Sequence, residues 1–101
     1  MTTFVMLSTL GPDGSETLKN NPARIREVNA EVEAMGATVL VQYVLLGQWD
    51  FVTIIEAPDE VVMARIATTL AARGTLKTRT MTAISVEDFI TGLGDGVGGA
   101  R

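Results

Sequence analysis

The sequence predicts an α+β domain with the element order β-α-β-β-α-β, in which a four-stranded antiparallel sheet carries two helices on one face. Residues 37–57 contain two β-branched, apolar runs separated by a short polar link with Gly47, which is typical of a β-hairpin. On each side of this hairpin, apolar residues recur at every third or fourth position, which indicates an amphipathic helix. A length of 101 residues fits one such domain.

The segment before the hairpin predicts a strand and then a helix. Residues 3–8 form a short apolar run that ends at a glycine- and proline-containing turn, which indicates the first strand. Asn21 precedes Pro22, which suits an N-cap followed by proline in the first helical turn. Residues 15–20 fit an additional helical turn, and Gly36 is expected to end the helix. The apolar stripe of this helix consists of Ile25, Val28, Val32 and Met35.

The segment after the hairpin predicts a second helix and a fourth strand. Asp59 is the expected N-cap of the helix, and Arg73 and Gly74 stand where its C-terminus is expected. Residues 75–83 are rich in threonine and alternate basic with neutral side chains, so this strand should be half solvated or at an edge. The apolar stripe of the helix consists of Val62, Met63, Ile66, Ala67 and Leu70.

The C-terminal residues are expected to lie outside the domain. Ser85 and Asp88 have the spacing of a helix cap before a single turn that ends at Gly92. Residues 92–101 are mostly glycine and indicate a flexible tail. We therefore expect residues 1–91 to form the domain.

Both faces of the sheet have apolar side chains that favour burial. With a hairpin link of two or four residues, cross-strand pairing places Val39, Val41, Tyr43, Leu45, Asp50, Val52, Ile54 and Glu56 on one face. The other face then carries Leu40, Gln42, Val44, Leu46, Trp49, Phe51, Thr53 and Ile55. The second set is more uniformly apolar, so we assign it to the helices. The first set should face a pocket or a second copy of the chain, which predicts a homodimer or a higher homo-oligomer.

The composition excludes several functional classes. The chain has no cysteine and no histidine, which removes thiol nucleophiles, disulfides and the commonest metal ligands, so we expect neither a metal nor a cofactor. A net charge of -4 argues against nucleic-acid and anionic membrane partners. The apolar runs are too short to span a bilayer and the N-terminus lacks a signal peptide pattern, so a cytoplasmic location is expected.

Three polar residues of the first face are candidate catalytic groups. A buried carboxylate of Asp50 or Glu56 could serve as a general base beside Tyr43. The structural alternatives are stronger, because aspartate at this position commonly closes a turn, and Glu56 could pair with Lys77 or Arg79. The two carboxylates lie six residues apart on an extended segment, roughly 20 Å, so they cannot work as a pair within one chain.

Three further residues are candidate ligand-binding groups, beside Tyr43 and the two carboxylates. Trp49 is the only tryptophan and could stack on a planar ligand, although packing beside the turn is the commoner role. Lys19 and Arg79 could bind an anionic ligand, with exposure to solvent as the alternative.

The hairpin link also carries a family resemblance. Residues 46–52, read as Leu-Gly-Gln-Trp-Asp-Phe-Val, followed by Glu-Ala-Pro-Asp at 56–59, resemble the core of the GYD-domain family. Gly47 and Asp50 occupy the glycine and aspartate positions, and Trp49 stands where that family has tyrosine. The resemblance extends from Phe4 to about Phe89 and implies a ferredoxin-like chain of the dimeric α/β-barrel group. It implies little about activity, since the wider group includes enzymes and ligand-binding modules.

These observations leave three functions open, and they do not decide whether the protein is an enzyme. The first is a homo-oligomeric domain that binds a small organic ligand in a pocket at the sheet. The second is a cofactor-independent monooxygenase or isomerase that acts on a planar hydrophobic substrate. The third is an adaptor that binds a partner by strand addition at the edge of residues 75–83.

Overall fold

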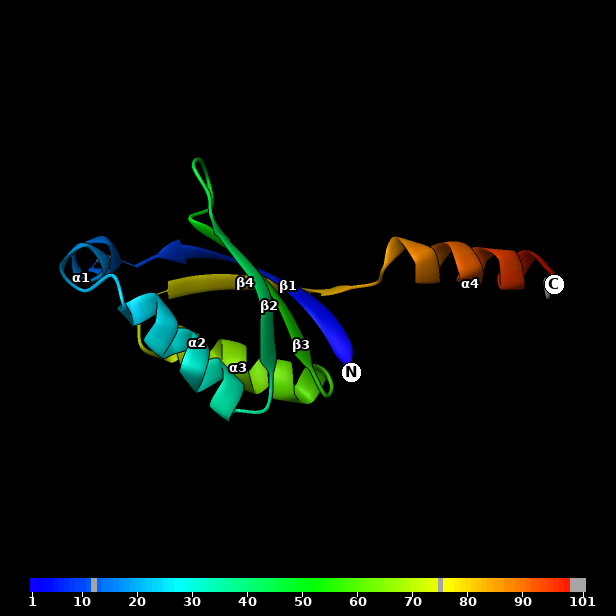
Figure 1. Cartoon of the computed structure of the whole chain (residues 1–101), viewed down its shortest axis with the longest axis horizontal. Coiled ribbons are helices and arrows are strands. Elements are labelled where there is room, and N and C mark those ends of the chain that lie inside the picture. The colour runs from blue at the N-terminus through cyan, green and yellow to red at the C-terminus, as the bar shows by residue number, and fades with distance from the viewer. Residues whose placement is uncertain (12, 75, 99–101) are drawn as a thin grey trace.

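A computed structural model describes residues 1–11, 13–74 and 76–98 (Figure 1). The elements follow in the order β1 (Thr2–Leu10), α1 (Gly14–Asn20), α2 (Arg24–Ala34), β2 (Thr38–Val44), β3 (Phe51–Ala57), α3 (Glu60–Ala72), β4 (Leu76–Ala83) and α4 (Val86–Gly98). The four strands form one sheet in the order β2-β3-β1-β4, and all neighbours are antiparallel. Helices α2 and α3 lie on the same side of it (Figure 1). The predicted ferredoxin-like α+β fold is therefore confirmed, with β4 at one edge.

Local capping explains where several elements begin and end. The Asp59 side chain accepts a hydrogen bond of 2.9 Å from the Val62 amide and starts α3, as predicted. Gly36 and Gly74 have φ angles of 103° and 72°, the left-handed conformation that ends α2 and α3. The predicted helix cap at Ser85 is also present, since its hydroxyl accepts a 3.0 Å bond from the Asp88 amide.

The predicted N-terminus of α2 is wrong. This helix begins at Arg24, whereas Asn21 follows the last residue of α1. The Asn21 amide donates to the Thr17 carbonyl at 2.9 Å, and the Asn21 carbonyl accepts from the Arg24 amide at 3.0 Å. The turn expected at residues 15–20 is thus a separate helix, α1. Asn21 lies at the C-terminal end of α1, since its amide donates to a carbonyl of that helix, and it does not cap α2.

A bulge in β2 changes the predicted faces of the sheet. Val39 pairs with Ile55 and packs against the core, whereas Val41 pairs with Ile54. The register shift between Val39 and Val41 leaves Leu40 as an extra residue, so Val39 lies on the helix side and its predicted face is wrong. Beyond the bulge, the predicted alternation of β2 and β3 is confirmed.

The hairpin link contains four residues, one of the two lengths considered. The Leu45 amide donates to the Asp50 carbonyl at 2.7 Å, which leaves residues 46–49 between them. Val44 and Leu46 were expected to pack under the helices, but they are 70% and 100% exposed. The end of the hairpin extends beyond the helices (Figure 1), so no helix reaches these side chains.

The core lies between the sheet and the pair α2 and α3. Strands β1 and β3 alternate in burial, and their helix-facing side chains meet the apolar stripes of the helices. The buried cluster consists of Phe4, Met6, Val32, Ala37, Ile55, Ala57, Met63, Ile66 and Leu70. Val28 and Met35 of the predicted stripe pack against this cluster with partial burial.

The C-terminal helix is longer than predicted. The single turn expected to end at Gly92 continues as α4 to Gly98, and the Ser85 hydroxyl caps its N-terminus. In Figure 1, α4 projects away from the sheet, and the longest extent of the molecule is 56 Å. Phe89, Ile90 and Leu93 are all more than half exposed. The division of the chain at residue 92 stays a prediction, and residues 99–101 lie outside the described part.

Of the helices in the described residues, none combines the length and the apolar composition needed to cross a bilayer.

Candidate functional site

No helix of the described residues lies over one face of the sheet, and we call this face the open face. Because Phe4, Met6 and Ser8 of β1 point toward the helices, the residues between them point the opposite way. The strand registers extend this face across the whole sheet. Its residues are Thr3, Val5, Leu7, Thr9, Thr38, Val41, Tyr43, Val52, Ile54, Glu56, Lys77, Arg79, Met81 and Ala83.

Two neighbouring rows of side chains make the centre of the open face apolar. The first row crosses all four strands through Val41, Ile54, Val5 and Met81. The second row consists of Tyr43, Val52, Leu7 and Arg79. In the isolated chain, Tyr43 is 63% exposed and Met81 is 43% exposed. Large apolar groups gathered in this way mark a surface that favours association.

The structure brings two of the predicted site residues together, Trp49 and Arg79. The Arg79 guanidinium carbon lies 5.9 Å from the centre of the Trp49 ring, whereas Tyr43 stands in the same row as Arg79 but on the opposite edge strand, roughly 14 Å away. The separation of 5.9 Å between Arg79 and Trp49 fits a cation–π contact. Trp49 therefore lies on the open side, not under the helices as predicted, because residues of a link do not follow strand alternation.

The other predicted site residues lie apart from this group. Glu56 pairs with Thr3 and Thr38, and it stands four residues from Val52 on β3, about 13 Å along the strand. Its suggested pairing with Lys77 or Arg79 is wrong, because β3 does not neighbour β4 and both basic residues lie toward the opposite end. Lys19 is exposed in the last turn of α1.

Asp50 fastens the hairpin link to β1. Its carboxylate Oδ2 accepts a hydrogen bond of 2.8 Å from the Leu10 amide, and its own amide donates to the Ser8 carbonyl at 2.9 Å. Together with the bond from Leu45, these contacts give Asp50 the turn-closing role that was weighed against catalysis. Catalysis by Asp50, Glu56 or Tyr43 stays a prediction.

We expect Asp50→Ala to destabilise the fold by about 1.5–3 kcal/mol, because it removes a charge-assisted hydrogen bond and leaves the Leu10 amide unpaired. Asp50→Asn keeps one acceptor oxygen and should restore part of the loss. Urea unfolding curves measure both changes. Asp13→Ala removes an exposed carboxylate that makes no cap hydrogen bond and is the control. Equal stability of the Asp50→Ala and Asp13→Ala variants would contradict the assignment.

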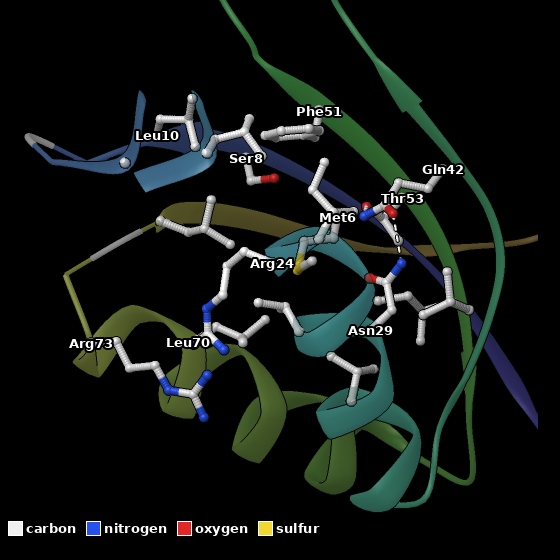
Figure 2. A pocket seen from close by; sticks show the side chains of 18 of the residues that line it. Met6, Ser8, Leu10, Arg24, Asn29, Gln42, Phe51, Thr53, Leu70 and Arg73 are labelled. Carbon is white, nitrogen blue, oxygen red and sulfur yellow. Dashed lines mark hydrogen bonds between the residues drawn. The ribbon is translucent and has the colours of Figure 1, made fainter. Parts of the chain in front are cut away.

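A cavity of about 70 Å³ lies on the opposite face, between the sheet and helices α1, α2 and α3 (Figure 2). Its walls are mainly apolar and include Ile25, Phe51 and Leu70. Polar groups enter it from several elements: Ser8, Arg24, Asn29, Gln42, Thr53 and Arg73. None of the predicted site residues lines this cavity, so the pocket expected beside Tyr43 and Glu56 is not the one described here.

A chain of hydrogen bonds forms one wall of the cavity. The Asn29 amide group donates to Gln42 Oε1 at 2.7 Å, and Gln42 Nε2 donates to Thr53 Oγ1 at 3.1 Å (Figure 2). These contacts join α2 to β2 and β3. The sequence offered one signal for this wall, since Gln42 interrupts an apolar strand on its helix-facing side.

Two arginines, Arg24 and Arg73, line the side of the cavity formed by α2 and α3, and each pairs with a glutamate. Arg73 Nη1 donates to Glu31 Oε1 at 2.9 Å, and Arg73 Nη2 also contacts this carboxylate. Arg24 Nη1 lies 3.1 Å from Glu27 Oε1 and 3.6 Å from Glu31 Oε1. The hydrogen bonds from Arg73 lower the pKa of Glu31 from its usual value, and Glu31 raises the pKa of Arg73.

Comparison with known proteins finds a matching family, a relative of known name and solved structures of similar fold. The sequence model of the family described as "GYD domain" matches residues 4–92. A protein of Thermus thermophilus is 51% identical over 94 residues, which cover 92% of this chain and 99% of the relative. That relative is named "Glutamine synthetase and cystathionine beta-lyase binding protein".

Two solved structures share the fold at low sequence identity. The crystal structure of FFRP-DM1 superposes with a TM-score of 0.56 at 23% identity, covering 83% of this chain and 100% of that one. The hypothetical protein PHS023 from Pyrococcus horikoshii gives a TM-score of 0.55 at 23% identity, covering 84% of this chain and 92% of that one. These likenesses concern the fold alone.

Proposed function

The chain belongs to the GYD-domain family, as the resemblance of its hairpin link predicted, and on that basis we propose that it is a protein-binding domain that associates with metabolic enzymes. The observation that carries this proposal is the 51% identity, over nearly the whole chain, to a protein named for binding glutamine synthetase and cystathionine beta-lyase. We propose the same two enzymes of the host as partners of this chain.

We further propose that the domain works as a homo-oligomer joined through its open face. The two apolar rows of this face cross all four strands, and no described element covers them. The face also carries both charge signs at opposite ends, Glu56 at one and Lys77 and Arg79 at the other, which suits contact with a second copy.

We assign the contact with the enzyme to α4. Figure 1 shows that α4 follows the edge strand β4 and projects away from the sheet, and we propose that it remains available when two copies pair through their open faces. Its exposed apolar residues, which include Phe89, Ile90 and Leu93, have the spacing of helix anchors that enter a groove on a partner. The exposed edge of β4 offers strand addition as the competing mode of binding.

We expect the purified chain to bind at least one of the two host enzymes, and surface plasmon resonance with each immobilised enzyme measures this directly. Phe89→Ser should weaken the interaction about tenfold or more, because it removes a large apolar anchor. Val61→Ser is the matched control, since Val61 is 77% exposed on α3. Absence of binding to both enzymes would refute the proposed partners, and equal affinities of the two variants would refute the role of α4.

No specific observation favours the alternative of a cofactor-independent monooxygenase or isomerase. It needs a substrate cavity beside Tyr43, Asp50 or Glu56, whereas the cavity described above opens on the other side of the sheet. The carboxylate of Asp50 is engaged with the Leu10 amide.

A further inference from the structure

The cavity under the helices has the size of a small metabolite. A volume of about 70 Å³ has room for about five water-sized groups. Drug-sized ligands occupy pockets of about 300 Å³ and more, so only a short molecule fits here. Its walls bring an apolar surface and a few polar groups together, which is the usual composition of a ligand site.

Ser8 places a buried hydroxyl at this cavity. The residue is 2% exposed and lines the cavity from β1, where its hydroxyl lies among the other lining side chains (Figure 2). A serine hydroxyl in this position can donate a hydrogen bond to a ligand. Thr53, which is also 2% exposed, accepts from Gln42 and still has its own proton to donate. The cavity therefore presents two hydroxyl donors at its inner wall.

Arg24 places an available cation at the same cavity. Its contacts to Glu27 and Glu31 both use Nη1, so Nη2 and Nε have no partner among the described residues. This edge of a guanidinium has the geometry that binds a carboxylate through two parallel hydrogen bonds. The Arg24 side chain is 34% exposed, which places it where a ligand can enter from solvent. Arg73, by contrast, uses both of its terminal nitrogens on Glu31.

We propose that this cavity binds a short aliphatic hydroxy or oxo acid. The carboxylate pairs with the free edge of Arg24, the hydrocarbon chain packs between Ile25, Phe51 and Leu70, and the oxygen on the chain accepts a hydrogen bond from the Ser8 hydroxyl. The chemistry of the walls selects these features, because each polar group of such a ligand then has a partner and the remainder meets apolar side chains.

Isothermal titration calorimetry of the full chain tests this proposal with straight-chain acids from acetate to hexanoate. Each acid is compared with the matched alcohol, the matched amine and the hydroxy and oxo acids of equal length. We expect saturable binding of acids, an optimum at intermediate chain length, tighter binding of the hydroxy or oxo form, and no binding of amines. Absence of saturable binding by every acid, or equal affinity for acids and alcohols, would overturn the proposal.

Variants of the cavity residues test which side chain binds the carboxylate of the ligand and which binds the oxygen on its chain. Arg24→Gln should weaken acid binding by about tenfold or more, whereas Arg26→Gln, on the same helix but outside this cavity, should not change it. Ser8→Ala should abolish the preference for hydroxy or oxo acids over unsubstituted acids of equal length. Val28→Phe fills the cavity without changing charge and should block all binding. Circular dichroism confirms that each variant is folded, and equal binding by the Arg24→Gln and Arg26→Gln variants would refute the carboxylate assignment.

Discussion

Replacing Ile54 with lysine is expected to give a folded chain that no longer forms homo-oligomers. Ile54 lies in the apolar row between Val41 and Val5 at the centre of the open face, and no described helix covers it. In the proposed pairing, each copy would bring one unpaired ammonium group into an apolar contact, with a cost of several kcal/mol, or roughly a hundredfold or more in the dissociation constant. In the isolated chain, the lysine head group extends into solvent, so the fold tolerates it.

Sedimentation velocity at micromolar concentration measures this effect. Val61→Lys is the control, because it introduces the same charge at an exposed position of α3 on the other side of the sheet. The control variant should sediment as the wild type does, and the Ile54→Lys variant as a monomer. A monomeric wild type, or an Ile54→Lys variant that still assembles, would refute pairing through the open face.

The same variant separates the two proposed surfaces. If α4 alone contacts the enzyme, monomers of Ile54→Lys should retain the intrinsic affinity for it and lose only the gain from presenting two helices at once. If the open face contacts the enzyme instead, binding should be lost together with assembly. Surface plasmon resonance at low enzyme density distinguishes these outcomes, because rebinding by two linked copies is then suppressed.

The alternation of residues predicted much of the fold. Along β3, the buried positions Phe51, Thr53 and Ile55 alternate with partly exposed ones, and these three belong to the more uniformly apolar set that was assigned to the helices. A glycine at each helix end and the aspartate at position 59 were sufficient to locate α3 and the end of α2. These signals are local, and tertiary packing reinforces them.

Features that depend on contacts between distant residues were not predicted. The bulge at Leu40 shifts the register by one residue, so the face of Val39 followed from pairing with β3 and not from its own neighbours in sequence. The cavity likewise depends on how α1 and α2 pack over the sheet. Its polar wall joins Asn29 of α2 to Gln42 and Thr53, and although the predicted pairing placed Gln42 and Thr53 on one face, no sequence spacing placed Asn29 against them.

Replacing Ile55 with alanine is expected to destabilise the fold by about 2–5 kcal/mol. Ile55 is fully buried on β3, with β1 and β2 on either side, and belongs to the same cluster as Met63 and Ile66 of α3. Removing three side-chain carbons there loses hydrophobic burial and leaves a cavity that the surrounding helix and strands fill only in part. Because domains of this size have total stabilities of about 5–15 kcal/mol, the change is a large fraction of the whole.

Ile54→Ala is the matched control, because it deletes the same atoms from the adjacent residue on the opposite face of the same strand. Urea unfolding should show a loss for Ile55→Ala that is the same at low and high protein concentration, since the side chain packs within one copy. The loss for Ile54→Ala should be smaller at low concentration and grow as the protein becomes concentrated, because the proposed assembly would stabilise the wild type by mass action. Losses of equal size at every concentration would contradict both the inward packing of Ile55 and the outward role of Ile54.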